Sequence, residues 1–102
     1  MIIMETNDYI ILGYEMELSN TYSTLAREIE SDNLDMVSAI CYFKHIPIRG
    51  KHGDWSDKIY DIADKCHKML YDYCIKKKYI DKSIPYDDYL NGALFEKYDR
   101  DF

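Results

Sequence analysis

An all-α fold is what the sequence predicts, as a four-helix assembly in one domain over residues 1–102. Apolar residues recur at the three- and four-residue spacing of a helix in several long stretches. The chain has only two prolines and four glycines, so these stretches are rarely interrupted. A chain of 102 residues is also close to the commonest size of a single domain.

The first helix is expected at about residues 14–30. Its inner face repeats apolar residues at spacings of four and three, at Tyr14, Leu18, Tyr22, Leu25 and Ile29. Residues 14–18 also alternate between apolar and polar, as in a strand. A short N-terminal β-hairpin, with a turn at residues 6–8, therefore remains the alternative to the helix.

The second helix is expected at about residues 33–45, after a break and cap at residues 31–33. Leu34, Val37, Cys41 and His45 share one side of this helix, and Phe43 lies nearly opposite. A helix that is apolar on two sides is either central in the core or partly covered by another chain. His45 lies on an apolar stripe and is expected to be a hydrogen-bonded core histidine.

The third helix, at about residues 56–78, has the clearest pattern, and Asp54 or Ser56 would cap its start. A fourth helix is expected at about residues 85–98, because proline suits the first turn of a helix. The outer face of the third helix carries acid–base pairs four residues apart, at Asp61–Lys65, Asp64–Lys68 and Asp72–Lys76.

Charge is uneven along the chain, whose net charge is −6. Residues 1–43 hold eight acids and one base, for a charge of −7, whereas residues 44–82 hold ten bases and six acids, for +4. The acidic balance argues against direct nucleic-acid binding, which needs bases facing phosphates. It suits attraction to a partner with a basic surface.

The cysteines, and the lack of a recognisable targeting signal, predict a cytoplasmic location. Cys41, Cys66 and Cys74 are odd in number and are expected to be buried thiols in a reducing compartment. No apolar run approaches the roughly 20 residues that cross a membrane, and residues 1–4 are too short for a signal-peptide core. We therefore expect a cytoplasmic protein, in the host cytoplasm if the gene is viral.

No catalytic motif is present, so no enzymatic activity and no cofactor are expected. Cys41–His45 and Cys66–His67 imitate parts of a zinc site but lack the usual pair spacing, so we expect no metal. Nor does the chain contain a phosphate-binding glycine motif or a serine nucleophile elbow. Were the chain an enzyme, its histidines would be the obvious acid–base groups.

The loop at residues 44–58 is a candidate anion site. It combines bases, a histidine and an aromatic around two glycines, just before a helix N-terminus that attracts anions. This predicts a binder of a phosphate-bearing small molecule or nucleotide, without turnover. The candidate ligand-binding residues are Lys44, Arg49, Lys51, His52 and Trp55.

The acidic N-terminal third is the preferred binding surface, because it interleaves acids with tyrosines, which are enriched at interfaces. Eleven tyrosines also exceed what the core of so small a domain can hold, so several should be exposed or half exposed. The candidate partner-binding residues are Tyr14, Glu15, Glu17, Tyr22, Glu28, Glu30, Asp32 and Asp35.

These features predict a small acidic inhibitor that blocks a basic, possibly nucleic-acid-binding, protein. Antitoxins, toxin-immunity proteins and phage or viral antagonists of host defence are small and acidic in this way. The many tyrosines and lysines and the few alanines are typical of A+T-rich genes, which include many phage and viral genes. An oligomeric structural protein is a further alternative.

Overall fold

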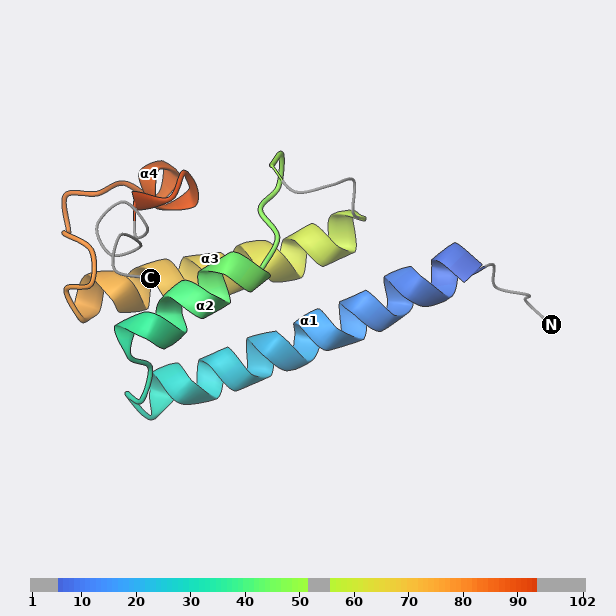
Figure 1. Cartoon of the computed structure of the whole chain (residues 1–102), viewed down its shortest axis with the longest axis horizontal. Coiled ribbons are helices and arrows are strands. Elements are labelled where there is room, and N and C mark those ends of the chain that lie inside the picture. Colours follow the sequence, from blue (N-terminus) through green and yellow to red (C-terminus); the bar gives the residue numbers. More distant parts are fainter. Residues whose placement is uncertain (1–5, 52–55, 94–102) are drawn as a thin grey trace.

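The computed structural model describes residues 6–51 and 56–93, with side chains from residue 13 onward. These residues form four helices and no strand: α1 (Thr6–Glu30), α2 (Met36–His45), α3 (Asp57–Lys76) and α4 (Tyr86–Leu90) (Figure 1). The predicted all-α fold is thus confirmed. No described helix is both long and apolar enough to cross a membrane.

The helix alternative holds for the N-terminal segment, and the hairpin alternative is wrong for the part of it that the structure describes. Helix α1 begins at Thr6, about eight residues before the predicted start. Leu18 is buried while Met16 is 62% exposed. Their alternation is therefore a local coincidence within the longer helical period. Residues 1–5 lie outside the described residues.

Helix α3 is the central element, because α1, α2 and α4 all pack on it. Figure 1 shows α1 along one side of α3, α4 on the other side, and α2 running back in the direction opposite to α1. Leu18 and Leu25 of α1 are buried in the same core as Ile59 and Leu70 of α3. The apolar stripes predicted for these two helices thus face each other.

The helix ends show how local chemistry sets the boundaries. Asp35 caps α2, because its carboxylate accepts a hydrogen bond of 2.8 Å from the backbone N–H of Ser38. The cap predicted at residues 31–33 is wrong, since Asp32 instead ends α1 with a left-handed backbone (φ 58°). Ser56 caps α3, as predicted, with its hydroxyl accepting from the N–H of Ile59.

The segments after α2 and before α4 help to close the core. Ile46 and Ile48 are buried although they belong to a connection. Helix α4 has Pro85 at its N-cap position and a fully buried Tyr89. It ends at Leu90, and Gly92 follows with a φ of 99°, so the predicted continuation of this helix through Gly92 is wrong. The predicted extension over residues 94–98 lies outside the described residues.

His67 of α3, and not His45, is the hydrogen-bonded histidine of the core. His67 is only 1% exposed, with Nε2 3.0 Å from the carbonyl oxygen of Ile46 and Nδ1 2.9 Å from the hydroxyl of Tyr89. A carbonyl only accepts, so Nε2 donates, and Nδ1 of a neutral ring then accepts from Tyr89. The prediction for His45 is wrong: this residue is exposed at the end of α2.

Candidate functional site

A groove of about 580 Å³ lies between α1 and α2. Both helices pack on α3, and the groove opens between them. One wall comes from α1, with Tyr14, Glu17, Leu18, Thr21 and Glu28. The other comes from α2, with Ser38, Cys41, Tyr42 and His45.

The groove is acidic. Glu17 and Glu28 supply two carboxylates, and none of the nine described lining residues is a lysine or arginine. Together with burial, this negative charge contributes to raised pKa values of the tyrosines on both walls. Burial raises the pKa of Tyr14, and the negative charge of Glu17 raises it further. Burial likewise raises the pKa of Tyr42, with an added contribution from its hydrogen bond to Glu28.

The α2 wall carries the thiol that differs from the other two. Cys41 is exposed, so the prediction that all three cysteines are buried is wrong for this residue. Cys66 and Cys74 are buried, and burial raises their pKa values to about 11 and about 12. Four residues after Cys41, Nδ1 of His45 donates to the Cys41 carbonyl oxygen at 2.7 Å.

The second apolar side of α2 is uncovered in the part of the chain that the structure describes. Helix α2 buries Ala39, Ile40 and Phe43 against the core. Val37, which shares the opposite side with Cys41, is 47% exposed. Among the described residues, α2 thus does not take the central position in the core that is one explanation for a helix apolar on two sides. Cover by another chain stays a prediction.

The eight predicted partner-binding residues do not form one patch. Tyr14, Glu17 and Glu28 line the groove. Tyr22 lies instead in a shallow depression of about 570 Å³ between α1 and α3, beside Lys65, Lys68 and Lys76. Helix geometry explains the split, because residues 17 and 22 fall on different sides of one helix. The lysine-lined depression was missed by the sequence analysis, which assigned these lysines to solvent-facing pairs.

The remaining acids have structural partners or lie elsewhere on the surface. Glu15 is only 15% exposed and pairs with Lys58 at 2.8 Å. Asp32 accepts from the hydroxyl of Tyr73 at 3.0 Å and from Lys77 at 3.1 Å. Those two hydrogen bonds lower the pKa of Asp32. Asp35 is the cap of α2, and Glu30 is exposed outside the groove.

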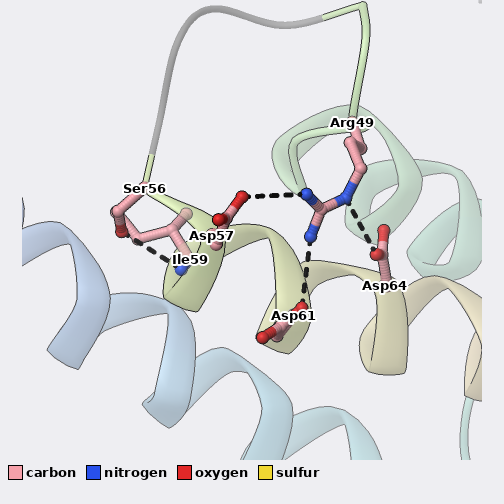
Figure 2. A network of polar contacts seen from close by, with 6 residues as sticks. All are labelled: Arg49, Ser56, Asp57, Ile59, Asp61 and Asp64. Carbon is pink, nitrogen blue, oxygen red and sulfur yellow. Dashed lines mark hydrogen bonds and ion pairs between the residues drawn. The ribbon is translucent and has the colours of Figure 1, made fainter.

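The candidate anion loop is largely neutralised where the structure describes it. Figure 2 shows the Arg49 guanidinium surrounded by carboxylates of α3. The distances are 3.2 Å to Asp57, 3.1 Å to Asp61 and 3.4 Å to Asp64. An anion would have to compete with three aspartates for Arg49. The predicted i, i+4 partners of Asp61 and Asp64 are thus replaced by an interaction distant in sequence.

The other residues predicted for the anion site lie apart from Arg49 or outside the described residues. Lys51 contacts the Asn91 side chain and, at 3.4 Å, the carbonyl oxygen of Leu90. Lys44 is exposed on α2. His52 and Trp55 lie outside the described residues.

Within the described ranges, no three His, Cys, Asp or Glu residues come together to hold a metal ion. Nor does comparison with known proteins supply a relative: no protein-family model, no curated protein and no solved structure matches this chain. Function has to be inferred from the chemistry of the α1–α2 groove itself.

Proposed function

We propose that this chain is a small acidic inhibitor that binds a basic partner protein through the α1–α2 groove. The observation that carries the proposal is the lining, which combines two glutamates and two tyrosines with no lysine or arginine among its described residues. Tyrosine supplies large contact area with a polar tip, and glutamate supplies charge complementarity. Such a surface complements the basic surfaces with which nucleases and DNA-binding proteins hold phosphates.

The surroundings of the groove support a protein over a small molecule as the ligand. A stable protein interface covers roughly 800 Å² on each partner, more than one pocket offers. Val37, 47% exposed, lies on α2 on the same side as the groove-lining Cys41. A partner that covers the groove can also cover Val37, whose exposure the fold itself does not require.

The proposed mechanism is steric and electrostatic. The chain carries a net charge of −6, so long-range attraction speeds its encounter with a basic protein. Once bound, the acidic α1 wall occupies the surface with which the partner would hold phosphates. This is the mode of action expected of an antitoxin, an immunity protein or a phage-encoded antagonist of host defence.

The test is an affinity pull-down from lysate of the source cell, and of its host if the source is viral, at low and high salt. Three forms are compared: the natural chain, the groove variant Glu17→Lys/Glu28→Lys, and the control variant Glu30→Lys/Asp88→Lys. Both variants change the net charge equally, and the control sites are exposed outside the groove. Circular dichroism confirms that each variant folds.

We expect one basic protein to be retained at low salt by the natural chain and by the control, and lost with the groove variant. High salt should weaken the retention, because exposed charges are screened over about 10 Å at 0.1 M. Retention by all three forms, or loss from both variants alike, would contradict the proposal.

A further inference from the structure

We propose that the part of the partner that enters the α1–α2 groove is a basic amphipathic α-helix, with its positive side chains against Glu17 and Glu28. This inference rests on the proposed function and specifies the form of the ligand.

The length of the groove along α1 fits a helix. Its lining on α1 runs from Tyr14 to Glu28, which is 14 residues at 1.5 Å each, or about 21 Å. A ligand helix of about 14 residues has this length. Both walls are helices, so a third helix can pack its side chains between theirs as in a helical bundle.

Backbone hydrogen bonding favours a helix over an extended peptide. The walls are helices, whose backbone N–H and C=O groups are largely bonded within the helices themselves, and the described residues contain no strand edge. An extended peptide would gain few backbone partners in the groove, whereas a helix satisfies its own. The side chains then decide the affinity, through Tyr14 and Tyr42 for apolar contact.

The positions of the carboxylates specify the charge pattern of this helix. Glu17 and Glu28 are 11 residues apart, which is three turns or about 16 Å along α1. Both lie on the groove side of α1. Glu28 is held from the opposite wall by Tyr42, so its carboxylate is already oriented. A ligand helix with lysine or arginine at two positions three turns apart meets both carboxylates at once.

Cys41 provides a direct measure of occupancy, because its thiol is exposed in the α2 wall while the other two thiols are buried. The probe is a synthetic, amidated helical peptide of about 15 residues, with leucines along one face and two lysines three turns apart. The matched control peptide carries glutamates in place of the two lysines. Alkylation of Cys41 by iodoacetamide is followed by mass spectrometry of the folded, full-length chain.

We expect the lysine peptide, at about ten times its Kd, to slow the alkylation of Cys41 about tenfold. The glutamate peptide should give no protection, and Glu17→Lys should abolish the protection by the lysine peptide. Absence of protection up to about 1 mM peptide would overturn the inference, as would equal protection by both peptides.

The two proposals fail in different ways. If the pull-down yields a basic protein that depends on Glu17 and Glu28, yet the lysine peptide leaves Cys41 unprotected, the proposed function stands and the helical ligand is wrong. If the groove variant and its control retain the same proteins, the proposed function itself is wrong.

Discussion

Replacing Tyr89 by Phe tests the hydrogen-bonded network that joins α4 to the core. Tyr89 is fully buried, and its hydroxyl donates to Nδ1 of His67 at 2.9 Å. The substitution leaves the ring in place, so no large cavity forms. It leaves Nδ1 of His67 without this donor in a buried site, which costs about 1–3 kcal/mol.

The assay is urea and thermal unfolding followed by circular dichroism at pH 7. For a domain of this size, each kcal/mol lowers Tm by about 4–8 °C, so Tyr89→Phe should lower Tm by at least about 4 °C. Tyr86→Phe is the control, because it removes a hydroxyl from the same helix at a residue that is only half-buried. It should change the free energy of unfolding by less than about 0.5 kcal/mol.

A Tyr89→Phe variant as stable as the natural chain would refute the reasoning about the His67 tautomer. Nδ1 would then not depend on Tyr89 as its donor. Equal loss in Tyr86→Phe would place the effect in α4 as a whole and not in the hydroxyl. Only a loss confined to Tyr89→Phe supports the network that is described above.

Three further predictions concern the fold. Asp35→Ala should lower the free energy of unfolding by about 0.5–2 kcal/mol, measured in urea, because α2 loses its cap. Burial raises the pKa of Cys66 and Cys74 from 9.0 to about 11 and about 12, so the folded state favours the neutral thiols. Their contribution to stability is complete below pH 9 and falls as the pH rises toward 12, and Cys74→Ala should flatten this part of the stability–pH profile. Arg49→Met should leave the Tm of thermal unfolding nearly unchanged, because Arg49 is 45% exposed and each of its three aspartate partners is at least 50% exposed.

The helices could be predicted because their signals are local. Leu18, Leu25 and Ile29 are seven and four residues apart in the sequence, a spacing that keeps them on one side of a helix, and all three are buried or half-buried in the structure. The cap at Ser56 likewise depends only on the residues that follow it. The start of α1 at Thr6 was missed, because an alternating segment satisfies the strand and the helix pattern over so few residues.

Which side of a helix faces the core could not be predicted from one helix alone. The sequence places Val37, Cys41 and His45 on one side of α2 and Phe43 on another, but only packing on α3 decides that Phe43 is buried. His67 shows the same limit. Its position beside Cys66 in the sequence does not reveal its hydrogen bond to the carbonyl oxygen of Ile46, which lies in the connection after α2. Both depend on contacts between residues far apart in sequence.

The candidate site was predicted in part for the same reason. Tyr14, Glu17 and Glu28 were selected by their charge and residue type, and the structure brings them together with Tyr42. Tyr42 had no signal in the sequence beyond being aromatic. Glu15 was selected on the same grounds, yet it faces Lys58 of α3, a partner that only the packing of α1 on α3 supplies.

The difference in length between α1 and α2 explains why a groove remains between them. Helix α1 has 25 residues, about 37 Å, whereas α2 has ten, about 15 Å. Because α2 runs back from the turn after α1, it ends before it can cover the side of α1 around Tyr14 and Glu17. Closing this side with a longer α2 would bury Glu17 and cost its desolvation. The basic partner that we propose would offset that desolvation with charges of its own, so we expect the groove to stay open in the free chain and to be covered in the complex.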